Sequence, residues 1–269
     1  MNFHNDEWIM EHVRQHYDEA LEYFPEDRIV ALILQGSQNY LLDTTYSDVD
    51  TKLILTPTFH DIAMNRQPIS TTHIRADNSH TDWKDIRLML QTFRKCSLNF
   101  LEILFSPYCI VNPLYEKEWN RLIENNELIA NYDPCKAIKT MRGLARRKYE
   151  QMEHESPSHH DDIEKYGYSP KEFHHLLRIE EYIARYISGE SYADCLHTKK
   201  AAYLRSVKLE PFHLDAARFL AERAMYHIDR MCDDFIAENA TEVNSDIDKL
   251  LDDVQYNIMK IAIEKELNK

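Results

Sequence analysis

A glycine–serine pair and a pair of aspartates are the residues in this sequence whose types and spacing could do chemistry. Gly36 and Ser37 follow the apolar run Ile29–Leu34, and Asp48 and Asp50 come roughly ten residues later. Backbone N–H groups at a turn of this kind can bind phosphate oxygens, and glycine lets the chain approach them closely. Side chains alternate along a strand, so Asp48 and Asp50 are expected to point to the same side.

Two carboxylates held this close repel each other unless a cation lies between them. Their oxygen atoms suit Mg²⁺, which proteins usually hold with one or two carboxylates plus substrate phosphates. Two such ions, Mg²⁺ or Mn²⁺, can activate an attacking hydroxyl and stabilise the pyrophosphate leaving group of a nucleoside triphosphate (NTP). The aspartate pair therefore predicts metal-assisted nucleotidyl transfer that needs no side-chain nucleophile.

The elements that must position these residues form a small sheet. Residues 5–24 place apolar side chains on one helical face, so an amphipathic helix is expected to open the chain. Buried strands are expected at 29–34 and 49–55, with weaker strand candidates at 73–75 and 80–85. From about residue 86 the apolar spacing is helical almost to the end. The expected helices span 86–95, 98–105, 114–126, 134–152, 170–187, 213–238 and 246–267.

This order predicts an α+β fold: a small mixed β-sheet domain with helices at 1–110, followed by an all-helical domain at 111–269. The polar segment 153–168 contains Pro157 and Gly167 and has no periodicity, so it is expected to be a flexible loop.

The Gly-Ser pair, the gap and the Asp-x-Asp pattern between two strands resemble the signature of the DNA polymerase β superfamily. In particular, GSQNYLLDTTYSDVDTK is similar to the predicted nucleotidyltransferases of bacteria and their phages. The resemblance implies that Gly36 and Ser37 hold the triphosphate of the NTP. It implies that Asp48 and Asp50 are catalytic and bind the metal ions, and that a third carboxylate comes from a neighbouring strand.

Two aspartates are candidates for that third carboxylate. Asp82 and Asp85 differ by an odd offset, so in a continuous strand they face opposite sides and only one can reach the metals. Asp85 directly precedes the helical run at 86–95, where its carboxylate would serve as an N-cap. Asp82 is therefore expected to be the third catalytic and metal-binding residue, with Asp85 as the alternative.

Two clusters of cationic side chains lie in the helical half. Arg142 shares a helix face with Lys139 and Arg146, at offsets of three and four residues, and a second cluster contains Lys171, His174, His175 and Arg178. The resemblance implies nucleotide binding for such clusters, because a triphosphate in an acidic site needs cationic donors. Arg142, Lys171, His175 and Arg178 are the expected nucleotide-binding residues. The alternative is a solvated helix face, and one functional cluster is expected rather than two.

Composition excludes several classes of function. The formal net charge of -14 argues against strong nonspecific binding to nucleic acid. No run approaches 18 apolar residues, so no membrane span is expected. The five cysteines are scattered without a CxxC pair and indicate reduced thiols in a cytoplasmic protein.

The sequence thus predicts a nucleotidyltransferase that uses an NTP, with ATP expected, and an acceptor hydroxyl on a protein, an RNA or a small molecule. The alternative is a non-catalytic nucleotide-binding or regulatory module with the same fold, for example half of a toxin–antitoxin pair. A helical ribonuclease is disfavoured, because Arg223 and His227 are one residue too close for the Arg-to-His spacing expected of the HEPN class.

Overall fold

The computed structural model describes residues 2–157, 159–240 and 243–268, and these form two compact units. The first unit comprises the described residues of Met1–Asn39, Asp43–Tyr132 and Val243–Lys269. The second comprises Tyr40–Leu42 and the described residues of Asp133–Glu242. Each unit has its own helices and its own packing.

The first unit is built on a five-stranded sheet with the strand order β3-β4-β2-β1-β5. Strands β2 and β4 pair in parallel and the other neighbours are antiparallel, which makes the sheet mixed. In chain order the elements are α1 (Asp6–Tyr23), η1 (Glu26–Arg28), β1 (Ile29–Gln35), η2 (Ser37–Tyr40, which ends in the second unit), β2 (Asp50–Leu55), α2 (Phe59–Ala63), β3 (Ser70–Ile74), β4 (His80–Asp85), α3 (Ile86–Arg94), α4 (Leu98–Leu101), η3 (Glu102–Leu104), β5 (Cys109–Val111), α5 (Glu116–Glu124), α6 (Asn126–Ala130) and α13 (Ser245–Leu267).

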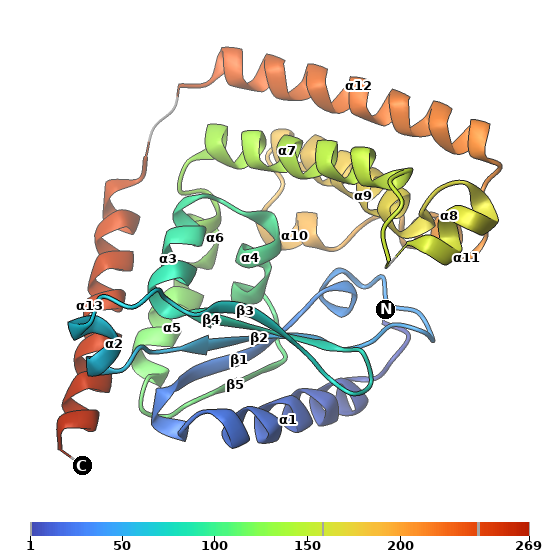
Figure 1. The fold of residues 1–269 in the computed structure, drawn as a ribbon. Coiled ribbons are helices and arrows are strands. Elements are labelled where there is room, and N and C mark those ends of the chain that lie inside the picture. Colours follow the sequence, from blue (N-terminus) through green and yellow to red (C-terminus); the bar gives the residue numbers. More distant parts are fainter. Residues whose placement is uncertain (1, 158, 241–242, 269) are drawn as a thin grey trace. The chain divides into compact units, whose positions relative to one another are not determined.

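Helices cover both faces of this sheet (Figure 1). Helix α1 packs on one face and α3 on the other, which explains why β1 is apolar and buried along almost its whole length. On the α1 face, Ile9 and Val13 of the helix pack against Leu32 and Leu34 of β1 and Leu53 of β2. Burial of this apolar surface is the main force that fixes the order of the central strands.

The parallel pairing of β2 with β4 decides where the polar side chains meet. Thr51 is the partner of Thr81, and Lys52 is the partner of Asp82. Both strands therefore begin at the same edge of the sheet, β2 with Asp50 and β4 with His80. The antiparallel pairing of β1 with β2 brings Gln35 opposite Asp50 at that edge.

The second unit is helical. Its elements are α7 (Pro134–Met152), α8 (His160–Tyr166), α9 (Pro170–Ile187), α10 (Tyr192–Leu196), α11 (Ala201–Leu209) and α12 (Leu214–Glu238). Helix α9 lies at the centre, in contact with α7, α10, α11 and α12, and most of its residues are buried (Figure 1).

The structure confirms the expected α+β class and adds elements that the sequence pattern did not indicate. Strand β5 is only three residues long, too short to show a period, and α8 lies inside the segment expected to be a flexible loop. The unit boundaries also differ from 1–110 and 111–269. Helices α5 and α6 belong to the first unit, and so does α13, which packs against α3 and α5. Among the described residues, no helix is long and apolar enough to cross a membrane.

Candidate metal and nucleotide site

Gly36 begins the turn that leaves β1. Its φ angle is +100°, a left-handed conformation that residues with a side chain rarely adopt. An added Cβ would meet nothing within 4 Å, so the backbone angle and not crowding requires glycine here. The Gly36 N–H donates to Oε1 of Glu102 at 3.1 Å. The binding of a triphosphate by Gly36 and Ser37 stays a prediction.

Two buried side-chain amides hold the turn in place. The Gln38 amide donates to the backbone carbonyl of Asp48 at 2.7 Å, and the Asn39 amide donates to the carbonyl of Leu34 at 3.0 Å. The first of these bonds joins the Gly-Ser turn directly to the backbone of the first aspartate. The two halves of the motif are therefore neighbours in space.

The loop before Asp48 is fixed by its own hydrogen bonds. The carboxylate of Asp43 is fully buried and accepts the backbone N–H groups of Phe3 and His4 at 2.8 and 2.9 Å. The Thr44 N–H donates to the Ser47 hydroxyl at 2.9 Å and closes a turn. These bonds set the path of the chain into β2 and so the position of Asp48.

Asp48, Asp50 and His80 form one group at this edge of the sheet, called here the Asp–Asp–His group. Each offers one ligand atom, and these atoms all lie within 4.8 Å of one another. The backbone N–H of His80 donates to Oδ1 of Asp50 at 2.8 Å, and Nδ1 of its ring lies 3.2 Å from the same oxygen. The group combines two carboxylates with an imidazole, which are all ligands for divalent cations.

Burial and charge repulsion both act on the carboxylates of this group. Burial raises the pKa of Asp50, the nearby Asp48 carboxylate raises it further, and the hydrogen bonds from His80 oppose both effects. Asp48 is exposed, whereas the side chains of Asp50 and His80 are 31% and 41% exposed. A cation beside these carboxylates would relieve the repulsion between them and still be reachable from solvent.

Asp82 lies outside the Asp–Asp–His group and has cationic and hydroxyl partners of its own. Its Oδ2 is 3.1 Å from Nζ of Lys52, and its Oδ1 accepts the Thr72 hydroxyl at 2.6 Å. Burial acts to raise the pKa of Asp82, but Lys52 and the Thr72 hydrogen bond outweigh it and hold the pKa below its usual value. Asp82 is therefore an ionised carboxylate whose charge is balanced by Lys52. Its assignment as the third metal ligand stays a prediction.

Lys52 is a buried cation two residues after Asp50 on the same side of β2. Its side chain is 3% exposed, and Nζ lies 4.4 Å from the centroid of the Phe100 ring. It also donates a hydrogen bond to Oε1 of Gln35. Burial lowers the pKa of Lys52, and the ion pair with Asp82 opposes that shift. Lys52 thus ties β1, β2 and β4 together directly beside the aspartate pair.

Asp85 caps helix α3, as the sequence predicts. Its carboxylate accepts the backbone N–H of Arg87 at 2.9 Å and two further hydrogen bonds from the Arg87 guanidinium. Its side chain is buried on the opposite side of β4 from Asp82. The arrangement identifies Asp85 as a structural residue of the helix N-terminus.

Helix α9 of the second unit carries three of the expected nucleotide-binding residues. Lys171 is exposed, His175 is partly exposed and Arg178 is buried at 4% exposure. Burial lowers the pKa of His175 well below its usual value, and the adjacent His174 and Arg178 lower it further. The Arg178 guanidinium stacks 3.8 Å from the ring centroid of Tyr40, the residue three positions after Ser37 in the chain.

Arg142 on α7 already has an acidic partner within the second unit. Its guanidinium lies 2.6 Å from Oδ1 of Asp233 on α12, and Arg146 pairs with Asp229 on the same helix at 3.1 Å. These ion pairs fit the interpretation of a solvated helix face.

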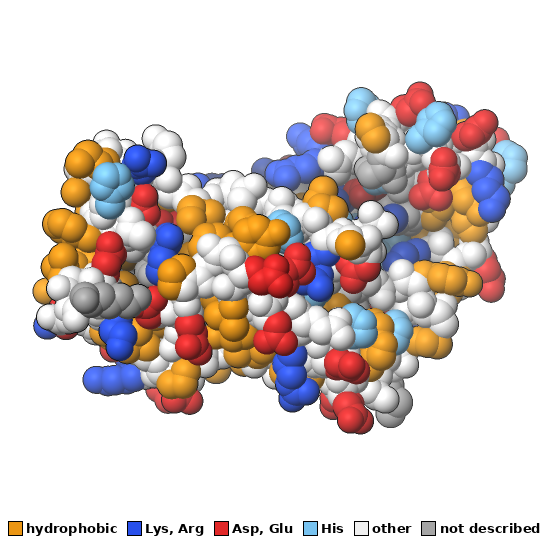
Figure 2. All heavy atoms as spheres, turned by 60° about the horizontal axis from the view of Figure 1, so that its bottom comes forward, with side chains coloured by type: hydrophobic (Ala, Val, Ile, Leu, Met, Phe, Trp, Pro, Cys, Tyr) orange, Lys and Arg blue, Asp and Glu red, His pale blue; other side chains and the backbone are white. Residues whose placement is uncertain are grey.

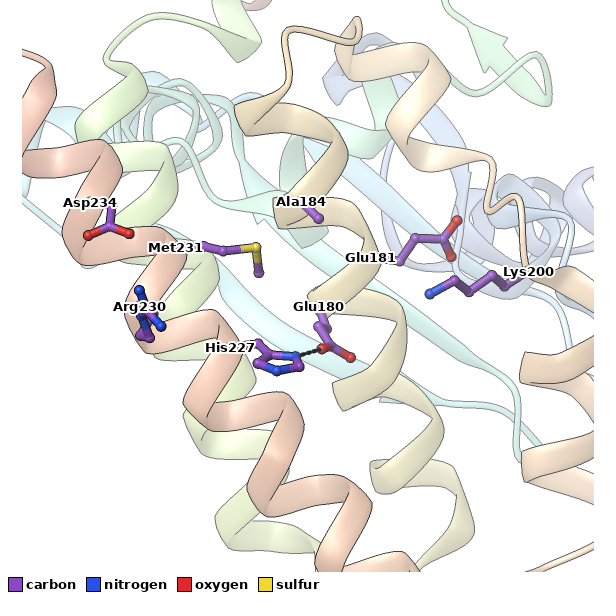
Figure 3. A pocket seen from close by; sticks show the side chains of 8 residues that line it. All are labelled: Glu180, Glu181, Ala184, Lys200, His227, Arg230, Met231 and Asp234. Carbon is purple, nitrogen blue, oxygen red and sulfur yellow. Dashed lines mark hydrogen bonds and ion pairs between the residues drawn. The ribbon is translucent and has the colours of Figure 1, made fainter.

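A separate pocket of about 400 Å³ lies in the second unit, against α9 and α12 (Figure 3). In its lining, Nδ1 of His227 lies 3.0 Å from Oε1 of Glu180. Met231 and Ala184 add apolar surface. None of the predicted site residues lines it. The other lining residues are Glu181, Lys200, Arg230 and Asp234. The pocket therefore mixes charges of both signs and has no single-sign character that would select a phosphate.

His80 and Lys52 are the site residues that sequence reasoning missed. Lys52 follows Asp50 by two positions in a predicted strand, so the same alternation that paired the aspartates also places the lysine on their side. To predict His80 one must know that β4 runs parallel to β2 and begins at the same edge of the sheet, and the sequence alone does not supply this pairing.

The molecular face drawn in Figure 2 shows Lys and Arg side chains interspersed with Asp and Glu, with apolar side chains between them. This distribution agrees with the net charge of -14.

Comparison with known proteins gives little beyond this geometry. No family model matches the chain, and no curated protein matches it in sequence. A nucleotidyltransferase-like protein from Exiguobacterium sibiricum 255-15 has a solved structure that is similar over 84% of this chain and 75% of that chain. The two share 10% sequence identity, and the TM-score is 0.31. A likeness at this TM-score indicates no function for this chain.

Proposed function

We propose that this protein is a nucleotidyltransferase that transfers a nucleoside monophosphate from an NTP, with ATP as the expected donor, to an acceptor hydroxyl and releases pyrophosphate. One observation carries the proposal. Asp50 begins β2 and Asp48 lies two residues before it, and the amide of Gln38 ties the Gly36–Ser37 turn to the backbone of Asp48. A phosphate-binding turn beside two carboxylates is what a metal-bound triphosphate needs.

The donor set fits the implied divalent cation. Two carboxylates with oxygen atoms close together suit Mg²⁺ or Mn²⁺, and Asp48 and Asp50 are the residues that would hold it. When bound, the cation neutralises phosphate charge and favours the deprotonated acceptor hydroxyl. The sequence predicts Asp82 as the third ligand. His80 is the alternative third ligand, because its ring lies beside the two aspartates in the Asp–Asp–His group.

The remaining residues bind and orient the nucleotide in this proposal. The Ser37 hydroxyl donates to the triphosphate, and Gly36 keeps the turn in its left-handed conformation. Nucleotide binding by Lys171, His175 and Arg178 of the second unit stays a prediction from the sequence, because such side chains can donate to phosphate oxygens. Arg142 has a weaker claim, because it would have to exchange its ion pair with Asp233 for a phosphate.

A second candidate function is a nucleotide-binding module without turnover. The ion pair between Asp82 and Lys52 favours it, because a carboxylate engaged by a buried lysine is a poor metal ligand. This candidate predicts metal-dependent NTP binding in the absence of any transferred product.

The experiment that tests the proposal is a transfer assay with each α-labelled NTP, Mg²⁺ or Mn²⁺, and cell extract as the source of acceptor. We expect label in a protein, RNA or small-molecule fraction, with ATP the best donor. In Asp48→Asn/Asp50→Asn the yield should fall at least about a hundredfold, because transition-state charge stabilisation is typically worth two to three orders of magnitude or more.

The matched control is Asp18→Asn, which removes an exposed carboxylate of α1 in the same unit. It should leave the labelling unchanged. Labelling by Asp48→Asn/Asp50→Asn at the wild-type level would refute the assignment of the aspartates. NTP binding without label in any fraction would favour the module without turnover.

A further inference from the structure

We propose that His80 is a metal ligand of this chain and makes the Asp–Asp–His group selective for Mn²⁺ over Mg²⁺. The inference concerns the metal site on which the proposed function rests, but it does not depend on turnover. It follows from the donor atoms and from the partners of the neighbouring carboxylate.

The geometry brings an imidazole nitrogen, and not a third carboxylate, to the aspartate pair. The ligand atoms of Asp48, Asp50 and His80 lie within 4.8 Å of one another, a spacing that one ion can bridge. His80 comes to this edge because β4 runs parallel to β2 and begins at the same level as Asp50. Its ring is 41% exposed, so a cation can reach it from solvent.

The contacts that Asp82 makes disfavour it as a ligand of this metal ion. One of its oxygens pairs with Lys52 at 3.1 Å, and the other accepts the Thr72 hydroxyl at 2.6 Å. A cation bound by Asp82 would displace at least one of these partners and lie near the buried charge of Lys52. Like charges in a weakly solvated environment repel strongly, so the pair disfavours a metal there.

Replacing one oxygen ligand by an imidazole changes which metal is preferred. Mg²⁺ demands oxygen ligands and gives up its waters reluctantly, whereas imidazole suits transition metals. Mn²⁺ accepts carboxylate oxygens and imidazole nitrogen together. A site with two carboxylates and one imidazole is therefore expected to hold Mn²⁺ more tightly than Mg²⁺.

The test measures Mn²⁺ binding to the full chain without nucleotide. Binding is monitored as the loss of the free-ion signal in electron paramagnetic resonance, and competition with Mg²⁺ gives the relative affinity of the two ions. We expect Mn²⁺ to bind about tenfold or more tightly than Mg²⁺. His80→Gln should lose about tenfold in Mn²⁺ affinity, the lower end of the range for changes at ligand residues and their partners, and little in Mg²⁺ affinity.

Pulsed spectroscopy of the bound Mn²⁺ gives a direct second readout. A coordinated imidazole produces a ¹⁴N coupling, which we expect in the wild type and not in His80→Gln. His73→Gln is the matched control, because His73 also pairs with a single carboxylate, Glu19 at 2.8 Å, and lies on the neighbouring strand β3. It should keep both the affinity and the coupling.

The rival ligand is tested with the charge-neutral double variant Lys52→Gln/Asp82→Asn, which removes both partners of the ion pair. Mn²⁺ affinity close to that of the wild type supports the proposal. A loss as large as that of His80→Gln, an absent ¹⁴N coupling in the wild type, or equal affinity for Mn²⁺ and Mg²⁺ would overturn it. If His80→Gln catalyses nucleotidyl transfer normally and has the same metal selectivity as the wild type, this inference is wrong and the proposed function is unaffected. Mn²⁺ binding through His80 without any transfer would sink the proposed function alone.

Discussion

Gly36 shows how one backbone angle can fix the identity of a residue. Its φ of +100° is open to glycine, and an L side chain would be strained there even though space for a Cβ exists. The Gly36 N–H donates to the carboxylate of Glu102. The residue therefore positions the turn that follows β1.

Gly36→Ala should lower the free energy of unfolding by about 1–2 kcal/mol, the usual cost of forcing a side chain into a left-handed conformation. Urea denaturation followed by circular dichroism measures it. The matched control is Gly143→Ala, because Gly143 lies inside helix α7 with no positive φ and nothing within 4 Å of an added Cβ. That variant should gain up to about 1 kcal/mol in helix propensity. A Gly36→Ala protein as stable as the wild type would show that the turn does not need its left-handed angle.

At the scale of residues, the aspartate pair and the glycine could be predicted because their information is local. Two-residue alternation places Asp48 and Asp50 on one side, and it equally places Lys52 there. The N-cap role of Asp85 is local as well, and the structure confirms it. His80 could not be predicted in this way, because its contact with Asp50 spans two strands that are thirty residues apart.

Among the elements, helix α1 contacts the strands that carry the Asp–Asp–His group. Its buried His16 contacts the hydroxyls of Thr51 at 2.9 Å and Thr81 at 3.2 Å, and it lies 3.3 Å from the Ser79 hydroxyl. Thr51 follows Asp50 in β2, and Thr81 follows His80 in β4. His16 therefore helps to fix the two strand starts that carry the Asp–Asp–His group.

This support is expected to weaken in acid. Burial, followed by the charge of Arg75, lowers the pKa of His16 from 6.5 to about 4. The neutral ring is favoured in the folded state, so the stability it contributes is complete above pH 6.5 and is lost as the pH falls from 6.5 towards 4. The loss amounts to about 3 kcal/mol for a fully buried group with this shift.

Tryptophan fluorescence reports this loss for the first unit alone, because Trp8, Trp83 and Trp119 all lie in it. Urea unfolding at pH 7 and pH 4.5 should show a smaller pH dependence in His16→Gln than in the wild type. His174→Gln is the matched control, since burial lowers the pKa of this second-unit histidine to about 4 as well. Identical pH dependence in wild type and His16→Gln would contradict the account.

The predictability of the elements depended on their length. The long helices and the buried strands β1 and β2 have enough residues to show a period, and they occur close to the expected positions. The expected helix 98–105 is instead the short helix α4 followed by η3. The expected helix 114–126 is the shorter α5, and α6 begins only at its last residue, Asn126. In both places the apolar spacing continues past the point where the helix changes or ends, so periodicity gives no boundary.

At the scale of the whole molecule, the order of the elements along the chain does not predict which unit each element belongs to. Helix α13 comes last in the chain, yet it packs on the first unit, where Arg94 of α3 pairs with Asp248 at 2.6 Å. The segment Tyr40–Leu42 belongs to the second unit although it follows the Gly-Ser turn directly. Such long-range packing leaves no local pattern in the sequence.

The claim on which the whole account depends is that the aspartate pair holds a divalent cation to which a triphosphate binds. Calorimetric titration with α,β-methylene ATP, whose α–β linkage cannot be cleaved, measures this without any acceptor. We predict binding in the presence of Mn²⁺ that is lost on chelation with EDTA and is weakened at least about tenfold in Asp48→Asn/Asp50→Asn. Binding of equal strength in the double variant, or no dependence on the metal, would contradict the account.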